Sequence, residues 1–184
     1  MDISPELNEV RLAASHEAET RRHEYLTPEH VLYGSLFFER GRQIITSCGG
    51  DAAALTEDLE GFFSRHVPVV EKEKPVQSVG FQSMMERAIL HTASAQKDTV
   101  RVDDVLASIL EEKDSFAVHY LARQGIARLG LLSYISHGVT AYPVDDDNGE
   151  EVDEESGEEG EEDLAEDGAG GGDPETGEVP GAGE

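Results

Sequence analysis

The sequence predicts an all-α protein of eight helices, arranged as two pseudo-symmetric four-helix repeats and followed by a disordered acidic tail. Three observations lead to this fold class. When the sequence is shifted by 74 positions, residues 26–32 fall on residues 100–106, and both copies open a helical pattern with an apolar pair. Apolar residues recur at helical spacing, and no stretch alternates as a strand would. After Gly138 the composition changes to Asp, Glu and Gly.

The first repeat is expected over about residues 3–66. Its first helix starts at a hydroxyl cap, Ser4, with Pro5 in the first helical position, and continues to about Arg22. Thr27 and Pro28 repeat this start signal for a second helix. The first half of the repeat is therefore a pair of helices that begin in the same way.

The second half of the first repeat contains two further helix patterns. Ile44, Ile45 and Cys48 indicate a short third helix, and Gly49 can end it because glycine adopts the left-handed conformation at low cost. Asp51 is suited to cap a fourth helix. The apolar residues of that fourth helix follow at helical spacing: Leu55, Leu59, Phe62 and Phe63.

The second repeat is expected over about residues 78–138, after a linker at residues 68–75. The shift of 74 aligns Leu7 with Phe81 and Ala14 with Ala88, so the first helix is repeated. Asp114 is expected to cap the third helix, which ends at Gly125. A last helix is predicted from three apolar residues: Leu129, Leu132 and Ile135.

The charge of the chain lies mostly in its last part. Residues 144–184 hold 19 of the 40 acidic residues and no Lys or Arg, so the first 143 residues contain 21 acidic and 14 basic residues. A net negative charge argues against nucleic acid or an anionic membrane surface as a partner. Residues 141–184 cannot bury enough apolar surface to fold, and we expect a disordered linker or tail that acts as a spacer.

The location of the protein is expected to be cytoplasmic. No run of about 18 apolar residues is present, so no transmembrane helix is predicted. The first ten residues lack the basic start and the apolar segment of a signal peptide. The single cysteine, Cys48, cannot form an internal disulfide, which fits a reducing compartment.

The sequence offers no strong catalytic or cofactor-binding motif. His23 and His30, with neighbouring carboxylates, are weak candidates for a zinc site, and the alternative is a solvated corner between two helices. Cys48 has no visible base and fits a core position better than a nucleophile. There is no phosphate-binding loop, so we expect neither enzymatic activity nor a cofactor in this chain.

Three blocks of residues, taken together and in this order, resemble a known family. They are RHEYLTPEHVL at residues 22–32, GFQSMMERA at residues 80–88 and LGLLSYISHG at residues 129–138. They are similar to the N-terminal Clp repeat domain of ClpA-type AAA+ unfoldases. The resemblance covers about residues 3–138 and places a double-repeat domain within residues 1–140.

The resemblance implies a docking function. In this family the N-terminal domain binds the adaptor ClpS, which delivers N-degron substrates, and it also contacts protein substrates directly. The ATP-dependent modules that unfold substrates and feed the ClpP peptidase follow the N-terminal domain, and ClpP is reached only through them. The adaptor contacts of the family match Glu24 and Glu29, and a third falls at Ser78.

The residues themselves leave two interpretations of the acidic pair open. Glu24 and Glu29 flank the start of a helix, where both carboxylates can project together from a rigid corner and attract a basic partner. Alternatively, they only favour the positive end of the helix. The second repeat has Arg101 in place of Thr27, so its helix lacks the hydroxyl cap, and docking is expected on the first repeat and its seam with the second.

The AAA+ modules are absent from this sequence, so two functional hypotheses stand. The first is a docking module of a longer unfoldase. The alternative is a stand-alone helical protein whose acidic tail binds or sequesters a basic partner.

Overall fold

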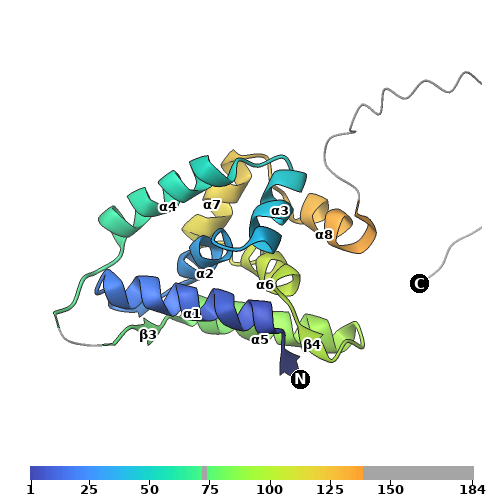
Figure 1. Cartoon of the computed structure of the whole chain (residues 1–184), viewed down its shortest axis with the longest axis horizontal. Helices are drawn as coiled ribbons and strands as arrows, with labels where there is room; N and C mark the ends of the chain where they lie inside the picture. Colours follow the sequence, from blue (N-terminus) through green and yellow to red (C-terminus); the bar gives the residue numbers. More distant parts are fainter. Residues whose placement is uncertain (72–73, 139–184) are drawn as a thin grey trace, which may run out of the picture. The chain divides into compact units, whose positions relative to one another are not determined.

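The computed structural model describes residues 1–71 and 74–138, and these residues form eight helices (Figure 1). The predicted all-α class is confirmed. The helices are α1 (Pro5–Thr20), α2 (Pro28–Ser35), α3 (Glu39–Ser47), α4 (Ala52–His66), α5 (Val79–Ser94), α6 (Val102–Ile109), α7 (Phe116–Arg123) and α8 (Arg128–His137).

The duplication predicted from the sequence is visible helix by helix. The bounds of α5 and α6 are those of α1 and α2 moved by 74 positions. For the remaining helices the offset is 76, since the buried residues of α3 (Gly41, Ile44, Ile45) correspond to those of α7 (Ala117, Tyr120, Leu121). The second repeat therefore has two additional residues between its second and third helices.

The predicted caps Ser4 and Asp51 are present as hydrogen bonds, and Ser78, for which no cap was predicted, makes the same bond as Ser4. Ser4 Oγ accepts from the N–H of Leu7, and Ser78 Oγ accepts from the N–H of Phe81, both at 3.1 Å. Asp51 caps α4 as predicted. The predicted cap Asp114 is wrong, because the Oγ of the next residue, Ser115, accepts from the N–H of Ala117.

The prediction that the chain contains no strand is also wrong. Four strands of two residues form two parallel pairs, β1 (Asp2–Ile3) with β4 (Thr99–Val100) and β2 (Tyr25–Leu26) with β3 (Val76–Gln77). Each pair joins one repeat to the other. Two residues are too few to show alternation, so only the packing of the repeats creates these strands.

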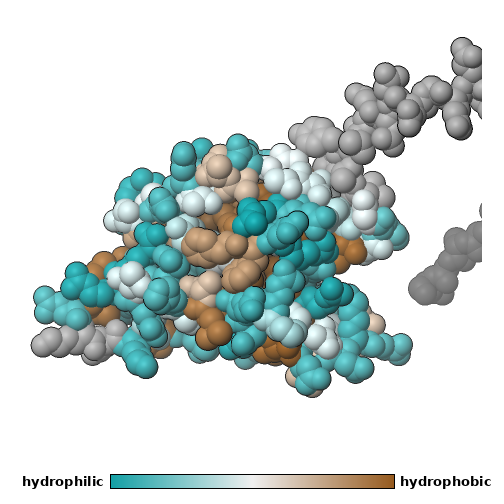
Figure 2. Space-filling view, viewed as in Figure 1, coloured by the Kyte–Doolittle hydropathy of each residue, from teal (hydrophilic) through white to brown (hydrophobic). Residues whose placement is uncertain are grey.

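The core is centred on α2 and α6, which lie in the middle of the molecule in Figure 1, with α1 and α5 along the lower edge of the view. Every residue of α2 is buried, and in α6 every residue except Asp104 is buried. The prediction for α8 is partly wrong, because Leu129 is 77% exposed and Leu131 is the buried residue. On the face shown in Figure 2, apolar surface reaches solvent between α1 and α4.

The predicted linker is partly paired with the first repeat. Val70 donates its N–H to the carbonyl of Arg22 at 2.8 Å, and Val69 forms an isolated bridge with His23. Residues 72–73 and the predicted disordered tail lie outside the described residues. Among the helices that the structure describes, none is long and apolar enough to cross a membrane.

Candidate docking site at the seam between the repeats

The histidine pair lies at the turn between α1 and α2, and it is not the solvated corner considered above. His23 is 3% exposed and His30 is fully buried. His23 Nδ1 lies 2.8 Å from His30 Nε2, and the ring of His30 stacks on Phe63 with 4.5 Å between centroids. The correction follows from Phe63 of α4, whose approach to the turn the sequence does not reveal.

The hydrogen bonds of the histidine pair define which ring nitrogen of His30 carries the proton. Thr27 donates its N–H to His30 Nδ1 at 3.1 Å, so this nitrogen is an acceptor and the proton of a neutral ring lies on Nε2. His30 then donates to His23 Nδ1. Burial, followed by the nearby charges of His23 and Arg21, lowers the pKa of His30 to about 3.

Among the described residues, the structure places no third zinc ligand beside His23 and His30. Within residues 1–71 and 74–138 no group of three or more His, Cys, Asp or Glu side chains is placed to hold a metal ion. Three of the four ring nitrogens of the pair already have the partners just described. The pair is best understood as a buried hydrogen-bonded unit that shapes the start of α2.

Glu29 is held inside the seam between the repeats. It is 4% exposed, and its Oε1 accepts from Ser115 Oγ at 2.7 Å and from the N–H of Ala117 at 3.1 Å. The expectation that Glu29 projects from a corner together with Glu24 is therefore wrong. The carboxylate instead binds the first turn of α7, whose unpaired N–H groups favour a negative charge.

A pocket of about 500 Å³ opens beside Glu29. It joins the two repeats, since Thr27 and Glu29 belong to the first and Ser78 to the second. The whole lining is Thr27, Glu29, Phe62, His66, Ser78, Val79, Gly80, Ser83, Glu112, Asp114, Ser115 and Phe116. Two of the three predicted adaptor contacts, Glu29 and Ser78, thus share one cavity although 49 positions separate them in the sequence.

One wall of this pocket is an aromatic stack. The ring of Phe116 lies 4.9 Å from that of Phe62 and 4.7 Å from that of His66, between centroids. Phe116 is 40% exposed. The sequence placed Phe62 among the apolar residues of its helix but did not indicate that Phe62, His66 and Phe116 meet, because only the contact between α4 and α7 brings the three rings together.

Glu24, the remaining predicted contact, does not line the pocket. It is half-buried, and its backbone carbonyl accepts from the N–H of Val76 at 2.9 Å. Val76 is two residues before Ser78. In the register of β2 and β3, Tyr25 pairs with Val76, so Ser78 comes opposite Thr27, three positions along the chain from Glu24.

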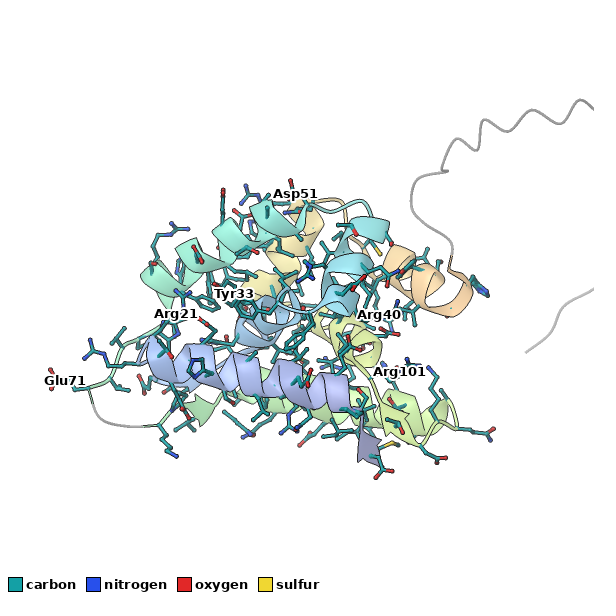
Figure 3. The ribbon with its side chains drawn as sticks, viewed as in Figure 1. Arg21, Tyr33, Arg40, Asp51, Glu71 and Arg101 are labelled. Atoms are coloured by element: carbon teal, nitrogen blue, oxygen red, sulfur yellow. The ribbon has the colours of Figure 1, made fainter. Side chains whose placement is uncertain are left out.

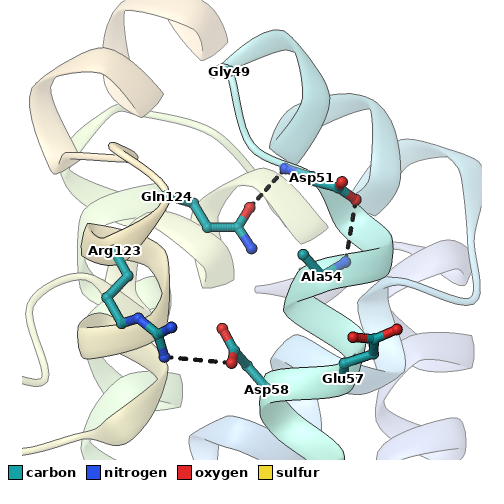
Figure 4. Close-up of a pocket in the computed structure, with 7 residues that line it drawn as sticks. All are labelled: Gly49, Asp51, Ala54, Glu57, Asp58, Arg123 and Gln124. Atoms are coloured by element: carbon teal, nitrogen blue, oxygen red, sulfur yellow. Dashed lines mark hydrogen bonds and ion pairs between the residues drawn. The ribbon is translucent and has the colours of Figure 1, made fainter.

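A second pocket, of about 430 Å³, lies between α4 and α7 on a different part of the molecule (Figure 4). Gln124 accepts from the N–H of Asp51 at 2.6 Å, and Arg123 pairs with Asp58 at 3.3 Å. Its polar groups thus hold α4 and α7 together. None of the predicted contact residues lines it.

The fold defines a class of protein, the double four-helix domains found at the N-terminus of Clp-type ATPases. The family model of the Clp repeat N-terminal domain matches residues 2–124. The chain belongs to this family. The match covers an N-terminal domain of this kind and not an ATPase domain.

A curated relative with the same kind of domain is a ClpA homolog protein of Fuscovulum blasticum. It is 30% identical over 145 residues, which are 77% of this chain and 18% of the relative. The chain thus spans about 18% of the length of that relative.

Solved structures share the fold at low sequence identity. The Hsp104 N-terminal domain from Candida albicans has a TM-score of 0.66 at 11% identity and covers 76% of this chain and 95% of that chain. The ClpV N-domain in complex with a VipB peptide has a TM-score of 0.60 at 16% identity, over 74% of this chain and 86% of that one. These structures establish the architecture, and the second shows that a related domain binds a peptide.

Proposed function

We propose that this chain is the adaptor- and substrate-docking module of a ClpA-type ATP-dependent unfoldase that feeds the ClpP peptidase. In this proposal a ClpS-type adaptor delivers N-degron substrates by binding at Glu24, Glu29 and Ser78. One observation carries it: Glu29 and Ser78, both assigned as contacts by the family resemblance, line the same pocket at the seam of a Clp repeat domain.

The chemistry of the pocket supports a protein partner with a basic surface. Glu29 and Asp114 supply carboxylates, while Glu112 is paired with Arg87 at 2.7 Å, and Phe62, His66 and Phe116 supply aromatic surface. Aromatic anchors surrounded by polar groups are typical of protein interfaces. The acidic rim would steer a basic partner and determine its orientation more than its total affinity.

A matched pair of serine variants tests the site. Ser78 and Ser4 make the same capping hydrogen bond at 3.1 Å, but only Ser78 lines the pocket. We expect Ser78→Ala and Ser4→Ala each to lower the free energy of unfolding by about 1 kcal/mol, the usual value of such a cap. Only Ser78→Ala should weaken the binding of a ClpS-type adaptor, measured by titration calorimetry. Equal adaptor affinity in both variants would remove Ser78 from the site.

Glu24→Lys provides the second test, because Glu24 is half-buried and its side chain can be replaced without opening the core. Reversal of this charge should weaken adaptor binding while the melting temperature stays nearly constant. Glu29→Lys is unsuitable, since it would leave a buried lysine against the start of α7. If the wild-type chain binds no ClpS-type adaptor, the proposed function is wrong.

A further inference from the structure

A small crevice lies between α1 and the start of α5. Its volume is about 90 Å³, and it shares no lining residue with the seam pocket. Leu26 and Phe81, which are 7% and 3% exposed, give it apolar surface. No described residue of the lining carries a carboxylate. The polar residues that line the crevice can all donate hydrogen bonds, and they are Asn8, Arg11 and Ser15 of α1 and Gln77 of β3.

Arg11 brings a positive charge to this crevice without a partner for it. The partly buried arginines of the described residues are Arg11, Arg21, Arg40 and Arg87. In the last three a carboxylate lies 3.1, 2.8 and 2.7 Å from the guanidinium (Arg21 and Arg40 are labelled in Figure 3). Arg11 pairs with no carboxylate among the described residues, and its Nε is shielded from solvent and donates no hydrogen bond to them. A polar group in this state costs free energy until a partner is supplied.

The fold does not require an arginine at this point. The shift of 74 positions that relates α1 to α5 places Arg11 on Met85 and Ser15 on Ile89. Met85 is partly buried and packs against the core as an apolar side chain. The second repeat therefore builds the same helix without a charge here. Packing accounts for the stem of Arg11, but it leaves the guanidinium unexplained.

We propose that this crevice binds a carboxylate of a protein partner and that Arg11 forms the ion pair with it. Nε and one Nη atom of a guanidinium form a fork that matches the two oxygens of a carboxylate. The chain shows this geometry elsewhere, since Arg40 donates from Nε to Oδ1 of Asp103 at 2.8 Å and from Nη2 to Oδ2 at 2.9 Å. The partner completes for Arg11 what Asp103 completes for Arg40.

The size of the crevice favours a carboxylate over a phosphate. Liquid water occupies about 30 Å³ per molecule, so a volume of about 90 Å³ suits a group of about three non-hydrogen atoms, as in a carboxylate. A phosphate group is larger. Leu12 also lines the crevice and is 62% exposed, so it offers apolar contact to the chain that carries the carboxylate. The occupant is therefore an acidic side chain or the C-terminus of a protein, and not a small free acid.

Three peptides that differ in one functional group test the inference. Acetyl-Ser-Gly-Glu-Gly-Ser-amide carries a side-chain carboxylate, and the same peptide with glutamine carries none. The glutamine peptide with a free C-terminus carries a terminal carboxylate. Each is titrated into the isotope-labelled full chain, and NMR follows the Nε–H signal of Arg11 and the backbone amide signals of Ser15 and Gln77.

At least one of the two carboxylate peptides should bind about tenfold more tightly than the neutral peptide and should shift the Nε–H signal of Arg11. The one that binds more tightly identifies the source of the carboxylate as a side chain or a C-terminus. Equal binding of all three peptides, or binding that leaves the Nε–H signal of Arg11 unmoved, would overturn the inference.

Matched variants separate the crevice from general attraction between charges. Arg11→Met introduces the residue type that α5 has at the equivalent position, and Arg65→Met removes the same charge from the exposed surface of α4. The preference for a carboxylate should disappear in Arg11→Met and persist in Arg65→Met. Arg11→Lys keeps the charge without the fork, so it serves if Arg11→Met does not fold, and it should weaken the preferred peptide about tenfold. Equal effects of the substitutions at Arg11 and Arg65 would mean that the crevice is not the site.

Discussion

At the scale of single residues, the two copies of one helix start use different chemistry for the same task. In α2, His30 accepts from the N–H of Thr27, and in α6, Asp104 accepts from the N–H of Arg101 at 2.9 Å. The residue seven positions earlier contacts each acceptor. It is His23 in the first repeat, and in the second it is Lys97, whose Nζ lies 3.8 Å from Asp104.

The first repeat thus has a buried neutral pair where the second has an ion pair. His30 is packed against Phe63, where a charge would be costly to bury. A neutral imidazole serves there because it accepts the capping hydrogen bond without carrying a charge.

This difference predicts a dependence of stability on pH. Because the pKa of His30 is about 3 in the folded chain against an ordinary value of 6.5, the unfolded chain binds more protons between those values. The contribution of neutral His30 to the free energy of unfolding is complete above pH 6.5. As the pH falls from 6.5 towards 3, this contribution decreases by about 1.4 kcal/mol per pH unit.

Urea denaturation at pH 7 and pH 5.5 measures the effect, with His30→Asn as the comparison. Asparagine offers a hydrogen-bond acceptor but does not titrate. Between pH 7 and pH 5.5 the free energy of unfolding of the variant should therefore fall by about 1 kcal/mol less than that of the wild type. The same loss in both proteins would mean that His30 is not the responsible group.

At the scale of helices, the close approach of α1 and α2 depends on a residue without a side chain. A Cβ atom at Gly34 would lie 2.9 Å from the carbonyl oxygen of Val10 and 3.1 Å from the nitrogen of Ala14. Both atoms belong to the backbone of α1 and cannot move without the helix. Gly34 therefore sets the distance between α1 and the central helix of the repeat.

Gly34→Ala should lower the free energy of unfolding by about 1–3 kcal/mol, as overpacking of a core does. The matched control is Gly130→Ala in α8, where a Cβ atom would meet nothing within 4 Å. There the better helix propensity of alanine should raise stability by about 0.5–1 kcal/mol. Opposite signs in thermal or chemical unfolding would confirm the packing argument, and a stabilised Gly34→Ala would refute it.

At the scale of the whole molecule, the two repeats are interleaved. Each of the two strand pairs takes one strand from each repeat, and Glu29 of the first repeat binds α7 of the second. Arg40 and Asp103 make the reciprocal contact. The seam pocket exists only where the repeats meet, so binding there should depend on the integrity of both.

Removal of residues 144–184 distinguishes the docking function from the sequestering alternative. These residues contain 19 acidic residues and no Lys or Arg, which suits capture of a basic partner. If docking occurs at the seam, a chain that ends at residue 143 should bind a ClpS-type adaptor with nearly unchanged affinity in titration calorimetry. A loss of binding would instead favour the alternative in which the acidic segment holds the partner.

The sequence predicted most of the fold because helix starts and apolar spacing are local signals. Ser4 and Asp51 cap the helices for which a cap was expected, since the side chain of each cap bonds only to the next few residues. Where two adjacent residues could serve, as with Asp114 and Ser115, the pattern could not choose between them. The family resemblance named Glu29 and Ser78, but it gave neither their burial nor their shared pocket.

By itself, the sequence determined the helices, their duplication and the family, because these properties depend on residues close together along the chain. Only the tertiary structure decided that His23 and His30 form a buried pair, that Glu29 faces inward and that Phe116 stacks on Phe62 and His66. These features depend on contacts between segments far apart in the sequence. Such contacts are created when the repeats pack, and no local pattern of residues specifies them.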